Sequence, residues 1–166
     1  MKFTGKVFKF GKNIDTDSMF PGKYLYEFRP EEVAKHAMEG IDPEFVSKVK
    51  PGDIILAGPN FGCGSAREQA AMTLKLAGIG VVVADSFARA FYRNAINNAL
   101  PVIALPGISE RISAGDILEV DVVSGSIRDL TTGETWKSAP TPDFVVKIYE
   151  CGGAIPYYRA KLKGEN

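Results

Sequence analysis

The sequence predicts an α/β fold with a parallel core sheet, flanking helices and an added antiparallel β portion. The middle third alternates between strand and helix patterns, and its predicted strands, at 54–57, 81–84 and 101–105, are wholly apolar. Such runs are typical of strands that are buried on both faces of a parallel sheet. The last third alternates apolar and polar residues around a Thr132-Gly133 turn, which is typical of an antiparallel meander. Together these patterns indicate a mixed central sheet.

The first third begins with an alternating strand at 3–10 and continues into a loop at 13–28 that is rich in turn-forming residues. Asp15 and Asp17 in this loop could together bind a metal ion, but side-chain turns are the favoured interpretation. The loop also holds three aromatic residues, which we expect to be exposed, as in a lid or a partner surface. They are Tyr24, Tyr26 and Phe28.

Helices are predicted from their start and stop signals. Proline and acidic residues at 30–32 begin the first one and Gly40 ends it. His36 lies on this helix, and we expect it to be a packed or surface residue. Asp85-Ser86 is expected to cap the helix that follows the second apolar strand. The predicted helices span 30–38, 43–49, 70–77, 87–97, 142–150 and 154–162, and the predicted strands of the last third span 115–122, 126–130 and 134–137.

Length, charge and composition limit the classes of function. A chain of 166 residues is large enough for one domain with its own core. Its 20 basic and 20 acidic residues balance, so the charge indicates neither nucleic acid nor membrane as a partner. The sequence has no signal-peptide core and no apolar run of about 20 residues, so we expect a cytoplasmic protein. The distant Cys63 and Cys151 fit a reducing compartment, and a single histidine excludes a His-based metal cluster made by this chain alone.

The chain is organised around a glycine-rich loop at 58–70, which joins the end of one predicted strand to the start of a helix. Loops of this kind turn backbone N–H groups toward one point, and the helix dipole adds positive potential there. Ser65 and Arg67 lie at this positive pole. The loop therefore predicts an anion-binding site.

Ser65 and Glu68 also have the spacing of a capping box, in which the serine hydroxyl accepts an N–H of the first helical turn. That interpretation needs no function, but the loop holds more glycine than a cap requires. In addition, Arg67 within the first helical turn would oppose the helix dipole unless it bound an anion. Its guanidinium matches a carboxylate or a phosphate, and the residues alone leave both open. Neither a Walker motif nor a Gly-x-Ser-x-Gly elbow is present.

Three motifs, in the same order, resemble the signatures of the swivel domain of the aconitase superfamily. The first is the loop itself at 60–70, and the second is Asn13-Ile14-Asp15-Thr16-Asp17 with Pro21-Gly22 and Tyr24-Leu25 after it. The third spans 86–94 with Asn97 after it. The resemblance runs through about Leu105 and more loosely to the end, so it implies a single swivel domain over 1–166. A chain of this length resembles the free-standing small subunits of 3-isopropylmalate dehydratase and its homoaconitase relatives.

The resemblance implies a hydro-lyase that is active only with a large subunit, a separate chain carrying a [4Fe–4S] cluster. It implies no cofactor or metal in this chain, whose two cysteines are too few for such a cluster. Ser65, as an alkoxide, would remove the proton from a carbon beside a carboxylate, and Asp17 is implied as a second catalytic residue close to it. Arg67 would hold a substrate carboxylate. Further positions of the motifs are implied to bind substrate, namely Asn60, Gly64, Ala66, Tyr24, Leu25 and Tyr26.

The loop departs from the family pattern at two positions. Ala66 stands where many relatives have a second serine, so one hydroxyl donor to the substrate is missing. Gln69 stands where many have histidine. Neither departure removes Ser65 or Arg67. Cys63, beside them, is expected to pack within the loop.

The residue after Tyr24-Leu25 indicates the substrate. Homoaconitases place an arginine there to bind an extra carboxylate, whereas this chain has Tyr26, which suits an apolar isopropyl group. We therefore expect interconversion of 2-isopropylmalate and 3-isopropylmalate by dehydration and rehydration, in leucine biosynthesis. Lys23, Arg29 or Arg89 could still supply a cation, so homoaconitase, dimethylmalate and citramalate types stay open.

A function of another class also stays open, namely a non-catalytic module that binds anions or regulates a partner. The presence of both Ser65 and Arg67 argues against it. For the catalytic function, the expected partners are the large subunit and a small 2-hydroxy di- or tricarboxylic acid. We expect a heterodimer or heterotetramer, and self-association of the isolated chain stays open.

Overall fold

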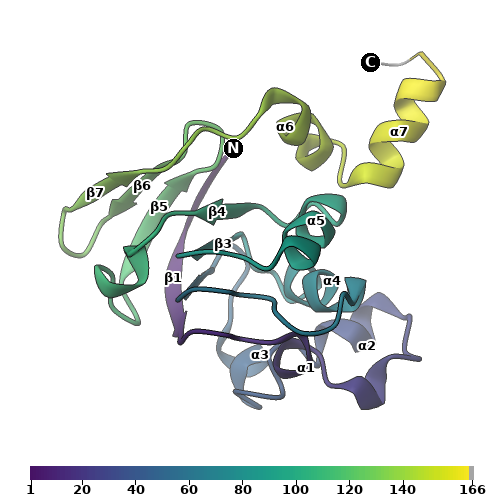
Figure 1. Ribbon diagram of the computed structural model, residues 1–166, viewed down its shortest axis with the longest axis horizontal. Coiled ribbons are helices and arrows are strands. Elements are labelled where there is room, and N and C mark those ends of the chain that lie inside the picture. Colours follow the sequence, from purple (N-terminus) through teal and green to yellow (C-terminus); the bar gives the residue numbers. More distant parts are fainter. Residues whose placement is uncertain (165–166) are drawn as a thin grey trace.

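Seven β-strands form one mixed sheet at the centre of the computed structural model, which describes residues 1–164 (Figure 1). Their order across the sheet is β4-β3-β2-β1-β5-β6-β7. The strands are β1 (Lys2–Phe10), β2 (Ile54–Ala57), β3 (Val81–Ala84), β4 (Val102–Ala104), β5 (Ile117–Asp121), β6 (Ser126–Asp129) and β7 (Thr135–Lys137). The helices are α1 (Thr16–Met19), α2 (Pro30–Ala34), α3 (Phe45–Lys48), α4 (Glu68–Leu76), α5 (Arg89–Asn97), α6 (Asp143–Glu150) and α7 (Ala154–Leu162). The predicted α/β class is confirmed.

β1 joins the parallel and the antiparallel halves of the sheet. Its residues 2–6 pair antiparallel with β5, and its residues 7–10 pair parallel with β2. β2, β3 and β4 continue as parallel neighbours, while β5, β6 and β7 form the antiparallel half. The parallel core and the meander predicted from the residue patterns are therefore both present.

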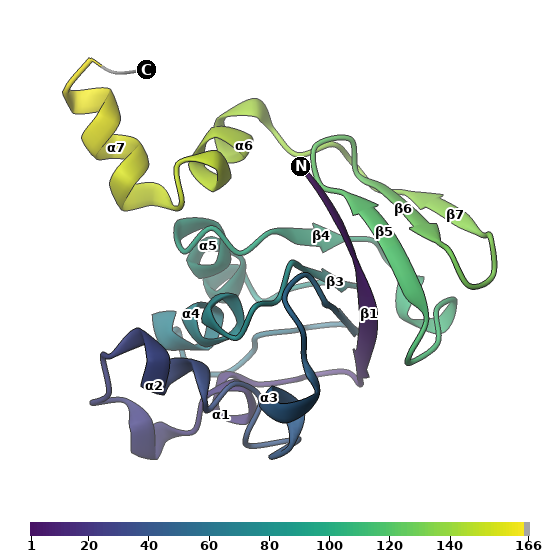
Figure 2. The same ribbon diagram turned by 180° about the vertical axis from the view of Figure 1, so that it is seen from behind.

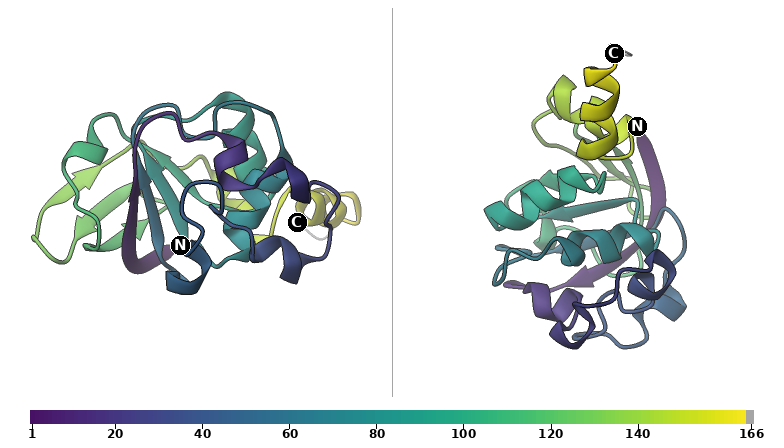
Figure 3. Two further views of the ribbon diagram at one scale, coloured as in Figure 1. Left: turned by 90° about the horizontal axis from the view of Figure 1, so that it is seen from below. Right: turned by 90° about the vertical axis from the view of Figure 1, so that its right-hand side faces the viewer.

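The strands of the parallel half are buried on both faces, so their alternate residues belong to two different cores. Ile55 and Val82 face the first core, which α4 and α5 cover. Ile54 and Val81 face the second core, which β5, β6 and α6 cover. The left-hand view of Figure 3 has the antiparallel strands on one side of the parallel strands, and α4 and α5 on the other. This arrangement explains why β2 and β3 are wholly apolar.

Two predicted boundaries in the first third are wrong. The loop predicted at 13–28 contains α1, because the Asp15 carboxylate accepts the backbone N–H of Ser18 at 2.7 Å and caps a single helical turn. Of the side-chain turns expected at Asp15 and Asp17, this bond confirms the one at Asp15, whereas Asp17 pairs with the distant Arg67. The helix predicted at 30–38 ends at Ala34, and turns follow in which Met38 adopts a φ of 59°.

The cap expected from Asp85-Ser86 is also wrong. α5 begins only at Arg89, and no side chain caps it. The Asp85 carboxylate instead accepts the backbone N–H and the hydroxyl of Ser109, at 2.9 and 2.8 Å. Ser86 Oγ accepts the backbone N–H of Asn60 at 2.9 Å. Both side chains bind distant loops, which a local spacing rule does not anticipate.

The last two helices, α6 and α7, lie close to their predicted ranges. Figure 2 shows α7 at one end of the molecule, away from the sheet, and none of its described residues is buried. Within residues 1–164, no helix is long and apolar enough to cross a membrane.

Candidate functional site

The three sequence motifs meet beyond the carboxyl ends of β1, β2 and β3, where open α/β sheets commonly bind ligands. The first and second motifs run side by side, because the Thr16 N–H donates to Cys63 O at 3.0 Å and the Gly62 N–H donates to Ile14 O at 2.8 Å. The third motif lies on the other side of the loop, where the Phe61 N–H donates to Ser86 O at 3.0 Å. Segments far apart in the sequence thus form one surface.

The glycine-rich loop between β2 and α4 needs its glycines for two reasons. Gly62 and Gly64 have φ angles of 81° and 88°, a region that side chains rarely adopt. A Cβ atom at Gly62 would also overlap the ring of Phe91, which is buried on α5. At the base of the loop Asn60 has a φ of 64°, and its amide donates to Asn13 Oδ1 at 3.0 Å. The loop is therefore fixed between two neighbouring segments.

Ser65 does not cap the helix. α4 begins at Glu68, its N-cap is Arg67, and no side chain caps it. The capping-box interpretation is therefore wrong, and Arg67 precedes the first helical turn instead of lying within it. The Glu68 carboxylate accepts the side-chain amide of Asn98 at 3.1 Å, so it is not available to close a capping box. Ser65 is exposed, and its Oγ has no hydrogen-bond partner within residues 1–164.

The exposed backbone of the loop offers unpaired donors. In the part of the chain that the structure describes, the N–H groups of Gly64, Ser65 and Ala66 have no acceptor. The first turn of α4 adds further N–H groups that no helical carbonyl can accept. The Ala66 carbonyl is held by the side-chain amide of Asn94 at 3.4 Å. These donors lie at Ser65 and next to it in the chain, as expected for a loop that binds an anion.

Arg67 and Asp17 come together as an ion pair, although 50 residues separate them. The Arg67 side chain is 19% exposed and the Asp17 side chain 63% exposed. Gly22 lies against the pair, since a Cβ atom there would be 3.5 Å from both Arg67 Nη1 and Asp17 Oδ1. Asp17 accepts from one guanidinium nitrogen only, so Arg67 keeps donors for a second carboxylate. Arg67 and Asp17, both predicted site residues, are thus in contact, and Arg67 lies two residues after Ser65 in the same loop.

The predicted substrate loop is only partly exposed. Tyr26 and Phe28 are 91% and 71% exposed, as expected. Tyr24 is half-buried, so its predicted exposure is wrong, because its ring stacks on His36 with the centroids 3.5 Å apart. The packed position expected for His36 is confirmed. Glu39 binds both rings and was not among the predicted residues, although its three-residue spacing from His36 is a signal for such a contact.

The residues of this chain do not fit a [4Fe–4S] cluster. Such a cluster with an open iron takes about three thiolates, and the sequence has two cysteines. Cys63 lies in the glycine-rich loop and Cys151 follows α6; both are free thiols. Within residues 1–164, no group of three His, Cys, Asp or Glu side chains is placed to hold a metal ion.

Residues 2–107 match the family model described as the aconitase C-terminal domain. The isopropylmalate/citramalate isomerase small subunit of Methanocaldococcus jannaschii is 54% identical over 158 residues, which cover 95% of this chain and 94% of that relative. The 3-isopropylmalate dehydratase small subunit of Thermodesulfovibrio yellowstonii is 47% identical over 166 residues, which cover 100% and 99% of the two chains.

Solved structures give the same result. The crystal structure of a 3-isopropylmalate dehydratase from Methanocaldococcus jannaschii matches with a TM-score of 0.93 and 42% identity, over 99% of this chain and 98% of that chain. Aconitase X of Thermococcus kodakaraensis matches with a TM-score of 0.55 and 14% identity, over 78% and 91% of the two chains, which is a likeness of fold alone. The predicted swivel-domain fold of aconitase type is confirmed.

Proposed function

Because the chain belongs to the aconitase C-terminal domain family, we propose that it is the small subunit of a 3-isopropylmalate dehydratase. In this role it is part of a hydro-lyase that interconverts 2-isopropylmalate and 3-isopropylmalate in leucine biosynthesis, in the cytoplasm. The observation that carries the proposal is the surface where an unpartnered Ser65 hydroxyl, unpaired loop amides and the Arg67–Asp17 pair lie together.

Ser65 is the proposed base. As an alkoxide, its Oγ takes the proton from the carbon beside a substrate carboxylate, the hydroxyl group leaves the neighbouring carbon as hydroxide, and a double bond forms between the two carbons. Water then adds its hydroxyl group in the other orientation, and its second proton neutralises the released hydroxide. Ser65 returns its proton to the carbon that lost the hydroxyl group. The alkoxide charge is favoured by the dipole of α4, by the amides of Gly64 and Ala66 and by Arg67.

Arg67 is the proposed carboxylate-binding residue, and Asp17 orients it. The guanidinium presents N–H donors in a plane, which pairs with a carboxylate through two parallel hydrogen bonds. Asp17 fixes this plane from one side, and Gly22 leaves room for the pair.

The remaining half of the site belongs to a partner. We propose a heterodimer or heterotetramer with a large subunit, whose [4Fe–4S] cluster supplies a Lewis acid for the hydroxyl group. The exposure of Gly64, Ser65 and Ala66 supports docking of a second chain over this loop.

A second candidate substrate is citramalate, because the name of the relative that is 54% identical includes it. Citramalate has a methyl group where isopropylmalate has an isopropyl group. Leu25 and the exposed ring of Tyr26 offer apolar surface to either group. The larger group gains more from such surface, at about 0.8 kcal/mol for each buried methylene, so isopropylmalate is the preferred substrate.

Reconstitution tests the proposal. This chain is combined anaerobically with the cluster-loaded large subunit of the same organism, and hydration of isopropylmaleate is followed. We expect activity from the complex and none from either chain alone. Activity of this chain alone would contradict the proposed partner. Inactivity of a complex with a verified cluster would favour the non-catalytic, anion-binding module.

Tyr26→Arg tests whether residue 26 selects the substrate. An arginine there can pair with an additional carboxylate, so we expect kcat/KM for homoaconitate relative to isopropylmalate to rise by about tenfold or more. The matched control is Phe28→Arg, which places the same charge on an exposed ring two residues further on. An unchanged ratio in Tyr26→Arg, or an equal rise in the control, would show that position 26 does not select.

A further inference from the structure

The segment that carries Tyr26 is held from both ends. Tyr26 itself is 91% exposed and has no side-chain hydrogen bond within residues 1–164, so its place depends on its neighbours. Tyr24 precedes it in a 3-10 turn, where the Leu25 N–H donates to Gly22 O at 3.2 Å. The Glu27 N–H donates to Tyr24 O at 2.9 Å. Whatever fixes Tyr24 and Glu27 therefore fixes Tyr26.

Glu39 fixes the first end. Its carboxylate accepts the hydroxyl of Tyr24 at 2.8 Å with one oxygen and lies 2.5 Å from His36 Nδ1 with the other. The Tyr24 and His36 rings stack at 13° to each other, and Lys23 Nζ lies 3.0 Å from the same carboxylate. Burial opposes the ionisation of Glu39, but the hydrogen bonds from His36, Tyr24 and Lys23 prevail and lower its pKa.

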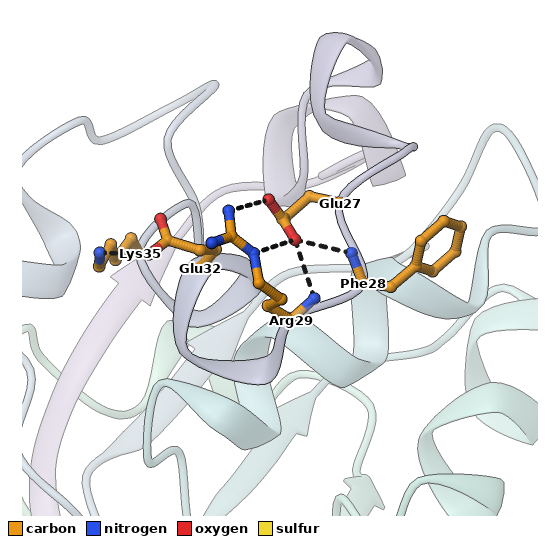
Figure 4. Close-up of polar contacts among 5 residues, drawn as sticks. All are labelled: Glu27, Phe28, Arg29, Glu32 and Lys35. Atoms are coloured by element: carbon orange, nitrogen blue, oxygen red, sulfur yellow. Dashed lines mark hydrogen bonds and ion pairs between the residues drawn. The ribbon is translucent and has the colours of Figure 1, made fainter.

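Glu27 fixes the second end (Figure 4). Its carboxylate accepts the backbone N–H groups of Phe28 and Arg29, at 3.0 and 2.9 Å, and pairs with the Arg29 guanidinium at 2.8 Å. Hydrogen bonds from the side chain and backbone of Arg29 lower the pKa of Glu27 to about 2. The carboxylate is therefore ionised at neutral pH, and the turn it makes closes the exposed segment.

The segment around Glu39 is itself joined to the candidate site. The Met38 N–H donates to Met19 O at 2.7 Å, and the Gly40 N–H donates to Ser18 O at 3.1 Å. A Cβ atom at Gly40 would lie 2.8 Å from the carbonyl oxygen of Asp17, so only glycine permits this approach. The backbone on both sides of Glu39 is thus held against the backbone at 17–19, which includes Asp17, the partner of Arg67.

We propose that Glu39, together with His36, is a positioning residue for substrate selection. Through Tyr24 it holds Leu25 and Tyr26 at a fixed distance from the Asp17–Arg67 pair, so the apolar end of the substrate meets a preformed surface. This role rests on the proposed function. It acts on the group that distinguishes substrates and leaves the chemistry at Ser65 unchanged.

Steady-state kinetics of the complex test this role. For Glu39→Ala we expect the KM for 2-isopropylmalate to rise about tenfold with kcat within about twofold, because a hydrogen bond to a charged group is lost. Glu39→Gln, which keeps an acceptor for Tyr24, is expected to recover part of the loss. The KM for citramalate is expected to change less. The matched control is Glu32→Gln, which removes an exposed ion pair with Lys35 near the same loop.

A fall in kcat without a change in KM, equal effects on both substrates, or the same effect in Glu32→Gln would overturn the proposal. Hydrogen exchange of the amides at 22–28 in the isolated chain gives a second readout that needs no activity. We expect about tenfold faster exchange there in Glu39→Ala and no change in Glu32→Gln. Unchanged exchange would overturn the proposed anchoring even in an active enzyme. If the wild-type complex is inactive but amide exchange at 22–28 changes in the two variants as expected, the proposed function is wrong and the anchoring by Glu39 is not.

Discussion

Ser65→Ala is expected to lower kcat of the reconstituted complex by about 10³-fold or more, since general-base catalysis contributes about 10²–10⁴-fold. The KM is expected to change by less than about threefold, because Ser65 would act in the transition state and Arg67 would still hold the substrate carboxylate. Alanine removes only the hydroxyl of an exposed residue, so the fold and the loop amides are retained. Initial rates of isopropylmaleate hydration, at saturating and at low substrate, measure the two parameters.

The matched control is Ser47→Ala. Ser47 lies on α3, outside the three motifs, and its hydroxyl donates to the carbonyl of Glu44 at 2.7 Å. Its loss is expected to leave both parameters within about twofold, as for surface substitutions in general. Residual activity above a tenth of wild type in Ser65→Ala, from a complex that assembles normally, would assign the base to another residue.

The meeting of the first and third motifs could be predicted from the sequence because it follows from the sheet. Wholly apolar runs such as 81–84 indicate parallel strands, and the carboxyl ends of parallel strands meet at one edge. The loops after β2 and β3 therefore had to be neighbours, whereas the alternating pattern at 3–10 does not reveal that β1 pairs in parallel with β2. Asp17 follows β1 and Arg67 follows β2, so their pairing depends on that parallel contact.

The helix caps could not be predicted, because local spacing alone does not decide them. Ser65 has the spacing of a cap, but the glycine conformations at 62 and 64 delay the start of α4 to Glu68. Asp85 has the composition of a cap, but Ser109 satisfies its carboxylate. At Asp85 a local propensity of about 1 kcal/mol is therefore overridden by tertiary contacts of equal or greater strength.

The contacts of Tyr24 with His36 and Glu39 were not predicted, for a different reason. An aromatic residue in a polar loop predicts exposure, and this holds for Tyr26 and Phe28. Tyr24 differs only because the turns after α2 bring His36 and Glu39 beneath it. Those turns replaced the predicted continuation of the helix, so the error in the helix boundary and the error in the exposure have one cause.

Gly62→Ala is expected to destabilise the protein by about 3 kcal/mol or more and to lower Tm by roughly 10 °C. A left-handed backbone conformation with a side chain contributes about 1–2 kcal/mol of this, and overpacking adds about 1–3 kcal/mol. The overlap is with Cβ as well as Cγ of Phe91, so a change of the Phe91 rotamer does not remove it. Relief requires movement of α5 or of the loop, and movement of the loop displaces Ser65.

Gly133→Ala separates the two contributions. Gly133 has a φ of 82°, against 81° for Gly62, and a Cβ atom there would meet no atom within 4 Å. It therefore carries the conformational cost alone, about 1–2 kcal/mol, and the difference between the variants measures the overlap with Phe91. Thermal unfolding of both variants gives the two values. Equal losses of stability in the two variants would show that the loop moves away from Phe91 at no cost. The geometry around Ser65, on which the proposed base depends, would then not be fixed.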